Sequence, residues 1–134
     1  ELIRDWHGEG ITNYMCGMAL GFDLMAAECV LQAKADFNDI TLTAVIPFRD
    51  QCGMWNWSDR QRYHAILQQA DFHILLSEVY YKGCLLVRND FMLKHASRIV
   101  AYYDGRRRGG TYYTCNKAGV MNIPVLNLYD HLSG

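Results

Sequence analysis

The sequence predicts an α/β protein with three layers, in which a parallel sheet carries helices on both faces. Short apolar runs alternate with longer amphipathic runs along the whole chain. The short runs are mostly apolar rather than apolar at every second position, which is typical of strands that are covered on both faces. Helices that alternate with such strands join them into a parallel sheet.

Each element follows from its local composition. Residues 11–16 (ITNYMC) form a short apolar run, and residues 22–35 are rich in Ala, Leu and Met, which favour a helix. The β-branched run at residues 40–46 predicts a strand that Pro47 ends. Ser58 is the expected N-cap of the helix that follows it. The remaining expected elements are helix 59–70, strand 72–76, helix 84–95, strand 98–103, helix 111–120 and strand 123–128.

Length and charge limit the classes of protein that fit. A chain of 134 residues predicts a single domain over residues 1–134. A hydrophobic share of 51% with 20% charged residues argues against disorder. The net charge of -1 makes a nucleic-acid binder or a membrane-surface binder unlikely on charge grounds. The three arginines at 106–108 still make a local basic patch that suits an anionic small molecule.

The cysteines predict a reducing compartment. There are five, they lie far apart, and none forms a CxxC pair, so neither a zinc site nor a disulfide framework is indicated. No apolar run reaches the length of a membrane span, and no signal peptide is visible. The histidines at 64, 73 and 95 lack metal-ligand spacing. We expect a cytoplasmic protein with no metal, no cofactor and no membrane partner.

Candidate ligand-binding residues collect after the expected strands. Ligands of parallel α/β sheets bind beyond the carboxyl ends of the strands. Glycine, hydroxyl, aromatic and charged residues follow four of the expected strands. The expected ligand-binding residues are Gly17, Met18, Ala19, Gly21, Asp23, Pro47, Phe48, Trp55, Ser77, Tyr80, Arg88, Asn89, Gly109, Gly110 and Thr111, with no catalytic residue among them.

The stretch CGMALGFD follows one strand and opens a helix. Gly17 and Gly21 allow a tight turn and a close approach of a ligand, and the N–H groups of a helix start favour an anion. Close packing of the helix on the strand explains the two glycines nearly as well. Asp23 either caps the helix or holds a ribose hydroxyl.

The stretch RRRGGT occupies a second strand-to-helix turn. Gly110 and Thr111 are suited to cradle a phosphate, whereas the arginines at 106–108 fit a solvated loop better than individual ligand contacts. Arg88 lies among apolar residues and needs a partner, which is either Asp90, Asp104 or an anionic ligand.

Aromatic residues follow the second and third strands. Trp55 and Tyr80 could stack a base or cover a sugar, although aromatic side chains more often lie in a core or an interface. The many aromatic residues also raise the expectation of a homo-oligomer.

Taken in order, these motifs resemble a known family. GMALGFDLMAAE, AVIPF with Gln51 and Trp55, YHAILQQAD, RNDFML, and YYDG followed by GGTYYT are similar to the YpsA-like family of the SLOG superfamily, from about residue 10 to residue 128. The resemblance implies a Rossmann-like fold, a bacterial or phage source, and kinship with the LOG phosphoribohydrolases and DprA. It also implies a nucleotide-related ligand held by the GMALG and GGT loops.

The chain departs from the family pattern in two places. The family begins with a strand that ends in a TGHR-like or GSR-like motif, whereas this chain begins at what resembles the following helix. LOG enzymes carry a PGGxGTxxE loop, and alignment on Gly110 and Thr111 puts Thr114 where their glutamate lies. The LOG arginine is matched by Arg88, but an arginine without that carboxylate does not supply the same acid–base chemistry.

Three functions remain open at this point. The first is binding, sensing or sequestering of a nucleotide-derived ligand such as an ADP-ribose-like metabolite. The second is hydrolysis of a nucleotide of the phosphoribohydrolase type. The third is a protein-interaction domain with a degenerate pocket, whose unpaired sheet edge recruits a partner strand. The candidate acids for the second are Asp23, Glu28, Glu78, Asp90 and Asp104.

Overall fold

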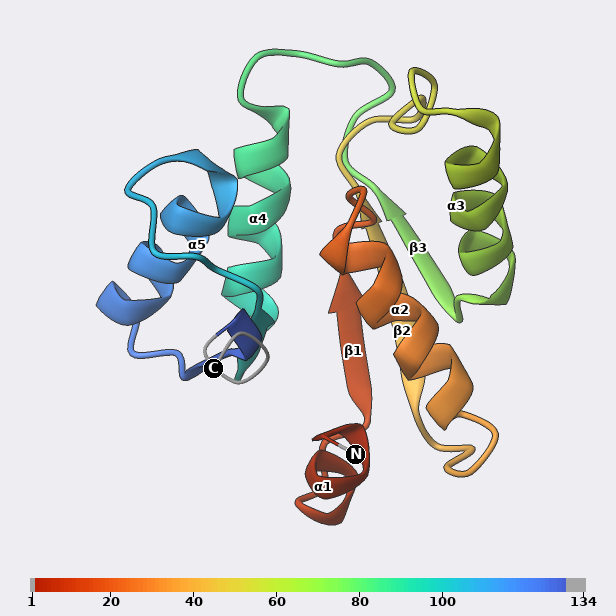
Figure 1. Ribbon diagram of the computed structural model, residues 1–134, viewed down its shortest axis with the longest axis vertical. Coiled ribbons are helices and arrows are strands. Elements are labelled where there is room, and N and C mark those ends of the chain that lie inside the picture. Colours follow the sequence, from red (N-terminus) through yellow and green to blue (C-terminus); the bar gives the residue numbers. More distant parts are fainter. Residues whose placement is uncertain (1, 130–134) are drawn as a thin grey trace. The chain divides into compact units, whose positions relative to one another are not determined.

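Helices and strands alternate through the part of the chain that the computed structural model describes, residues 2–129 (Figure 1). They are grouped into two compact units, unit 1 at Glu1–Tyr80 and unit 2 at Tyr81–Gly134, and each unit is described by itself. The expectation of one domain over residues 1–134 stays a prediction.

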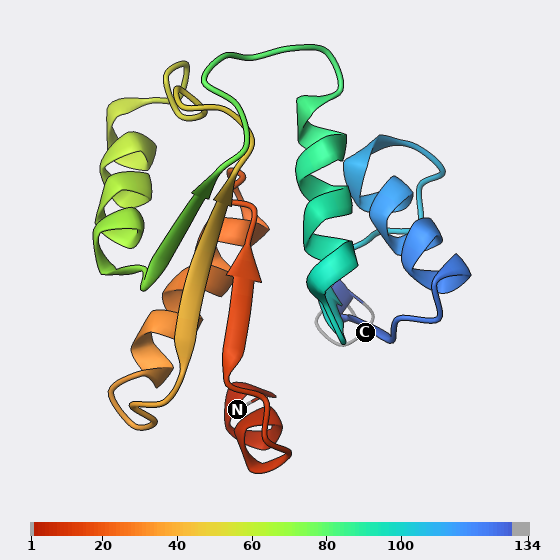
Figure 2. The same ribbon diagram turned by 180° about the vertical axis from the view of Figure 1, so that it is seen from behind.

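Unit 1 contains a three-stranded parallel sheet in the order β1-β2-β3. In the register of the sheet, Cys16 pairs with Ala44 and Ile46 pairs with Leu75, so the carboxyl ends of the three strands lie at one edge. Figure 2 shows the strands from behind, with α2 on their far side. The elements of unit 1 are α1 (Leu2–Gly8), β1 (Asn13–Cys16), α2 (Phe22–Ala33), β2 (Thr41–Ile46), α3 (Trp57–Gln69) and β3 (Phe72–Leu75).

The core of unit 1 lies between the sheet and the helices α2 and α3. Leu24, Ala27 and Val30 recur every three residues on α2, so they form one buried stripe. Tyr63 and Ile66 of α3 join the same cluster, together with alternate residues of β2. Full burial of a side chain such as Leu24 or Ile66 stabilises the fold by about 2 kcal/mol.

The opposite face of this sheet carries both apolar and polar residues. Met15, Thr43, Val45 and Ile74 lie on it, because they alternate with the residues that face α2 and α3. Val45 is fully buried there, whereas Phe72 on the same face is 59% exposed. Near its carboxyl end the central strand β2 is therefore buried on both faces, which is typical of parallel sheets.

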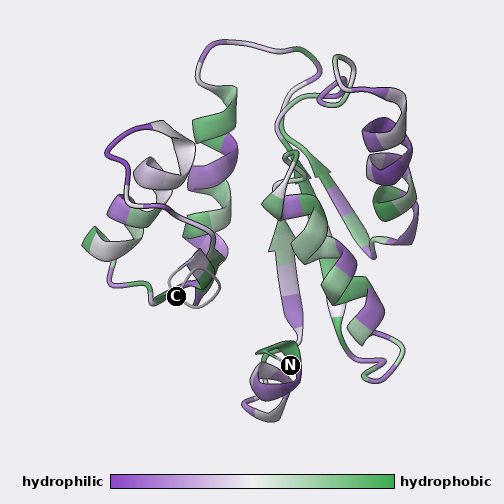
Figure 3. Cartoon of the chain, in the orientation of Figure 1, coloured by the Kyte–Doolittle hydropathy of each residue, from purple (hydrophilic) through white to green (hydrophobic). Residues whose placement is uncertain are grey.

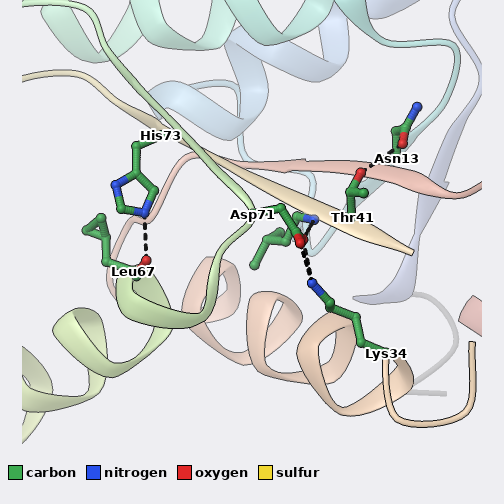
Figure 4. A network of polar contacts seen from close by, with 7 residues as sticks. Asn13, Lys34, Thr41, Leu67, Asp71 and His73 are labelled. Carbon is green, nitrogen blue, oxygen red and sulfur yellow. Dashed lines mark hydrogen bonds and ion pairs between the residues drawn. The ribbon is translucent and has the colours of Figure 1, made fainter. Parts of the chain in front are cut away.

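A polar network joins the elements of unit 1 at the amino ends of the strands (Figure 4). The carboxylate of Asp71 accepts a hydrogen bond from Lys34 Nζ at 2.6 Å and one from the Leu42 N–H at 2.8 Å. Thr41 donates to Asn13 Oδ1 at 2.8 Å, which links β2 to β1. Asp71 therefore ties α2 and β2 to the start of β3.

Unit 2 repeats the strand–helix alternation with a two-stranded parallel sheet. Its elements are α4 (Cys84–His95), β4 (Ile99–Ala101), α5 (Gly109–Val120) and β5 (Val125–Asn127). Strands β4 and β5 pair in parallel, and α4 packs against α5. With parallel strands and alternating helices in both units, the predicted α/β, Rossmann-like class is confirmed.

All expected elements except helix 84–95 differ from the sequence prediction by one or two residues at an end, and three of these differences have a cause in the structure. Strand β1 begins at Asn13, because the N–H of Ile11 bonds to the carbonyl of Trp6 in α1. The N-cap of α3 is Asn56 rather than Ser58, since the Asn56 side chain accepts from the Asp59 N–H at 2.8 Å.

Helix α5 is the third case. It begins at Gly109 rather than at Thr111, so both glycines of the GGT stretch lie in its first turn. In residues 2–129, no helix combines the length and the apolar character that crossing a membrane would require.

We predict that Asp71→Asn destabilises the fold. The hydrogen bonds from Lys34 and from the Leu42 N–H lower the pKa of the Asp71 carboxyl. The folded pKa is then below the unfolded value of about 3.9, so the stabilisation is complete above that pH and is lost as the pH falls through the folded pKa. At neutral pH the free energy of unfolding should fall by about 1 kcal/mol in urea titrations.

The matched control is Asp36→Asn, which removes an exposed carboxylate of the same unit. The control should unfold at the wild-type urea concentration. The difference between wild type and Asp71→Asn should shrink at acidic pH. Equal stability of the two variants at neutral pH would contradict this role for Asp71.

Candidate functional site

Three loops of unit 1 share the carboxyl edge of its sheet, as the sequence predicts. They follow β1, β2 and β3, and the parallel register brings them to the same side. Arg49 and Glu78 form a two-pronged ion pair between the second and third loops, at 2.6 and 2.8 Å. The rings of Phe48 and Tyr80 meet edge to face with centroids 5.3 Å apart. These contacts cross-link the edge.

The Gly17–Gly21 loop is held by side chains at both of its ends. Met18 N–H donates to Cys16 Sγ at 3.3 Å. Ala19 N–H donates to the Asp23 carboxylate at 3.2 Å. Asp23 therefore reaches back from the first turn of α2 to fix the loop, and the N-cap position of α2 is Gly21 rather than Asp23.

A buried glutamine links the same loop to its neighbours. The Gln51 side-chain amide donates to the carbonyl of Gly17 at 3.1 Å, and its oxygen accepts from the Tyr63 hydroxyl at 3.2 Å. One residue further along each segment, Cys52 Sγ lies 3.7 Å from His64 Nε2. Burial raises the pKa of the Cys52 thiol. Two adjacent pairs thus join the loop after β2 to α3.

Met18 has an unusual backbone conformation. Its φ is 60°, in the left-handed region, and its side chain is fully buried in the core of unit 1. A residue other than glycine in this conformation stores about 1–3 kcal/mol of strain, which surrounding structure must offset. Gly21 has a φ of 94° where α2 begins, a conformation that requires glycine. The loop geometry is therefore fixed before any ligand arrives.

The remaining predicted residues of unit 1 divide between packing and exposure. Pro47 is fully buried, and Trp55 packs on the core with its ring edge to face against Tyr63 at 5.4 Å. Trp55 thus packs as the core alternative expects, and its contact with a ligand stays a prediction. Ser77 donates to the carbonyl of Val79 at 2.7 Å, so its hydroxyl shapes its own loop. Tyr80 is 64% exposed and leaves an aromatic face accessible.

Unit 2 brings three other predicted residues together. Arg88 is buried, and its Nε donates to Asn89 Oδ1 at 2.7 Å. A Cβ placed on Gly110 would lie 3.5 Å from Asn89 Nδ2, so the amide of Asn89 lies beside the first turn of α5. Gly109 and Thr111 of the same turn are exposed.

The two carboxylates proposed as partners of Arg88 form ion pairs with other basic side chains. Asp90 accepts from Lys117 Nζ at 2.8 Å and from the Tyr113 hydroxyl at 3.0 Å. The hydrogen bond to Asp90 raises the pKa of Lys117. Asp104 pairs with Arg106 at 3.0 Å. Neither carboxylate is reserved for Arg88.

Sequence reasoning missed the roles of Gln51 and Tyr63. Gln51 is polar and buried, and it follows β2 at the edge where ligands bind. That position could have identified Gln51 as a candidate site residue, but only the folded chain brings its side chain to Gly17.

Over residues 2–129, histidine, cysteine, aspartate and glutamate form no group of three close enough to hold a metal ion.

Comparison with known proteins finds relatives of the same kind. The UPF0398 protein of Halalkalibacterium halodurans is 30% identical over 78% of this chain and 57% of its own length. A UPF0398 protein of Staphylococcus epidermidis is 31% identical over the same shares. The UPF0398 protein YpsA of Bacillus subtilis is 26% identical over 82% of this chain and 62% of its own. The chain thus spans a little over half the length of these relatives.

The family model YpsA, described as the YspA SLOG family, matches residues 1–122. The matched range contains both the Gly17–Gly21 loop and the first turn of α5. The resemblance read from the ordered motifs is confirmed, and the chain belongs to the YspA SLOG family.

Proposed function

We propose that this chain binds a nucleotide or a nucleotide-derived metabolite, such as an ADP-ribose-like compound, and thereby senses or sequesters it. The observation that carries the proposal is the pre-organised Gly17–Gly21 loop at the carboxyl edge of a parallel sheet. A loop that is already fixed loses little conformational entropy when a ligand binds. The left-handed Met18 is consistent with strain retained at a functional site.

The helix starts give chemical support for an anionic ligand. Helix α3 has a side-chain cap, which Asn56 supplies. Helix α2 begins at Gly21, and α5 begins after Arg108, and neither residue caps its helix with a side chain. The positive end of the helix dipole favours a phosphate at such a terminus.

Unit 2 has anion-binding features of its own at the start of α5. Gly110 keeps the first turn of α5 free of a side chain next to the Asn89 amide. An amide that donates, beside backbone N–H groups, is suited to a phosphate or ribose oxygen. The exposed face of Tyr80 in unit 1 could cover a base or a sugar.

The carboxylates favour binding over hydrolysis. Thr114 occupies the place of the LOG glutamate, and its hydroxyl is buried without a hydrogen-bond partner among the described residues. A general acid that cleaves a glycosidic bond needs a raised pKa. Ion pairs with Arg62 and Arg49 instead lower the pKa values of Glu28 and Glu78.

The other candidate acids are also engaged by donors. Asp23 accepts from Ala19, Asp90 from Lys117, and Asp104 from Arg106.

The proposal includes a cytoplasmic location and a homo-oligomeric state. Nucleotide metabolites are cytoplasmic, and exposed aromatic residues suit an interface.

Thermal unfolding against a ligand panel tests the proposal. The panel contains nucleoside mono- and diphosphates, ADP-ribose, NAD and cyclic dinucleotides. A ligand present at about 100 times its dissociation constant stabilises the folded chain by about 2.7 kcal/mol, which moves the unfolding midpoint by several degrees. No shift with any member of the panel would contradict the proposal.

We predict that Gly110→Asp weakens nucleotide binding at least about tenfold, because the new carboxylate repels phosphate at the start of α5. The variant should fold, since a Cβ at this position makes ordinary contact with Asn89 and an acidic residue suits a helix N-terminus. Isothermal titration calorimetry with the ligand found in the panel measures the effect. Asn116→Asp, which adds the same charge further along α5, is the control and should keep the wild-type affinity.

We also predict that Gln51→Leu lowers the affinity for the same ligand more than Tyr63→Phe does. Gln51→Leu removes the donor to Gly17, whereas Tyr63→Phe removes only a donor to Gln51. Each loss of a buried partner costs about 1–3 kcal/mol of stability, so urea unfolding at saturating ligand checks that both variants are folded. Equal affinities in both folded variants would show that the position of Gly17 does not govern binding.

A further inference from the structure

The two units carry opposite charge. Residues 81–134 contain eight lysines and arginines against three aspartates. Residues 1–80 contain five lysines and arginines against eleven aspartates and glutamates. The net charge of -1 for the whole chain is therefore a sum over an acidic unit 1 and a basic unit 2. It does not describe the surface of either unit.

Five of the eight basic residues of unit 2 lie near the starts of α4 and α5. Helices α4 and α5 both begin at the end of unit 2 to which the loop after β4 leads (Figure 1). Lys82 precedes α4, Arg88 lies one turn into it, and residues 106–108 lead into α5. Asp104 is the acidic residue that accompanies them in this loop. The other three lie away from these starts: Lys94 in the last turn of α4, Arg98 just before β4, and Lys117 further along α5, where it pairs with Asp90.

The arginine loop, residues 104–108, faces solvent. The Arg106 side chain is 69% exposed although it pairs with Asp104, and Arg107 and Arg108 are exposed as well. Figure 3 colours this loop as hydrophilic beside the paler start of α5. Guanidinium groups on long, exposed side chains are suited to contact a phosphate backbone rather than to line a tight pocket.

Tyrosines accompany the arginine loop. Tyr102, which directly follows β4, is 43% exposed. The Tyr103 hydroxyl donates to the Arg106 carbonyl at 2.6 Å, and the Tyr103 ring lies 6.3 Å from that of Tyr112 in the first part of α5. Aromatic rings next to a basic loop are the combination that binds unpaired bases by stacking while cations contact the backbone.

We propose that the arginine loop binds single-stranded nucleic acid through its phosphate backbone. Adjacent cations at three successive positions match successive phosphates of one strand better than the single phosphate group of a metabolite. The tyrosines favour a nucleic acid over an anionic lipid surface, because unpaired bases stack on them. The inference departs from the expectation based on whole-chain charge, since that expectation averaged the two units. It does not rest on the proposed metabolite site.

Fluorescence anisotropy of labelled oligonucleotides of about 20 residues, DNA and RNA, tests the proposal in the full chain. Binding should be measurable at about 50 mM salt and should weaken as salt rises, with a log–log slope of about -0.7 for each phosphate contact. If each of the three arginines contacts one phosphate, the slope should be about -2, which is three times the value for a single contact.

The test variant is Arg107→Ala with Arg108→Ala, which should lose about tenfold in affinity at low salt and reduce the slope by about 1.4. The matched control is Arg4→Ala with Lys94→Ala, which removes two exposed cations outside the arginine loop and should bind as wild type does. DNA and RNA of the same sequence are compared to identify which strand is preferred.

The inference is overturned if the wild type does not bind either oligonucleotide at about 50 mM salt, or if both double variants lose affinity equally. It is also overturned if vesicles with anionic lipids bind the loop and oligonucleotides do not. The metabolite panel is repeated on Arg107→Ala with Arg108→Ala. A retained thermal shift with lost oligonucleotide binding separates the two sites, so that either proposal can fail alone.

Discussion

Parallel pairing of β2 with both β1 and β3 is the constraint on which the candidate site of unit 1 depends. Because the register aligns Cys16 with Ala44 and Ile46 with Leu75, three loops that are distant in sequence begin at the same edge. Only there can Gln51 reach Gly17 and can Arg49 reach Glu78. A slip of the register by one residue would turn each core side chain to the opposite face and separate these pairs.

The Gly17–Gly21 loop is held in place because three of its backbone polar groups bond to side chains. The loop carbonyl of Gly17, the N–H of Ala19 and the N–H of Met18 all have side-chain partners within unit 1. The buried Met18 side chain offsets the strain of its own left-handed backbone, since removing it from the core would expose a large apolar surface. Core packing and loop geometry are therefore coupled at one residue.

Much of the fold follows from local patterns in the sequence. Residues 84–95 form a helix with the bounds that the sequence predicts, and each expected strand is present. The strands are shorter than predicted, because the length of a strand depends on its pairing with a neighbour. At the end of β4, for example, the N–H and the carbonyl of Tyr103 bond to the Asn127 side chain rather than to the β5 backbone. No local pattern of Tyr103 could reveal this.

The site was predictable as a location but not as a set of contacts. Gly17, Gly21 and Gly110 could be found because glycine at a strand-to-helix turn has a local signal. Gln51 and Tyr63 could not, because their roles exist only through residues more than ten positions away. The basic net charge of unit 2 could not be predicted either, because the boundary between the units at Tyr81 is known only from the folded chain.

The most direct test of the central claim is a two-dimensional NMR titration of the 15N-labelled chain with the nucleotide ligand found by thermal shift. The account predicts that the backbone amide signals of the Gly17–Gly21 loop move and saturate as the ligand is added. Saturable shifts confined to other regions of unit 1, such as the outer surfaces of α2 and α3, with this loop unmoved, would contradict it.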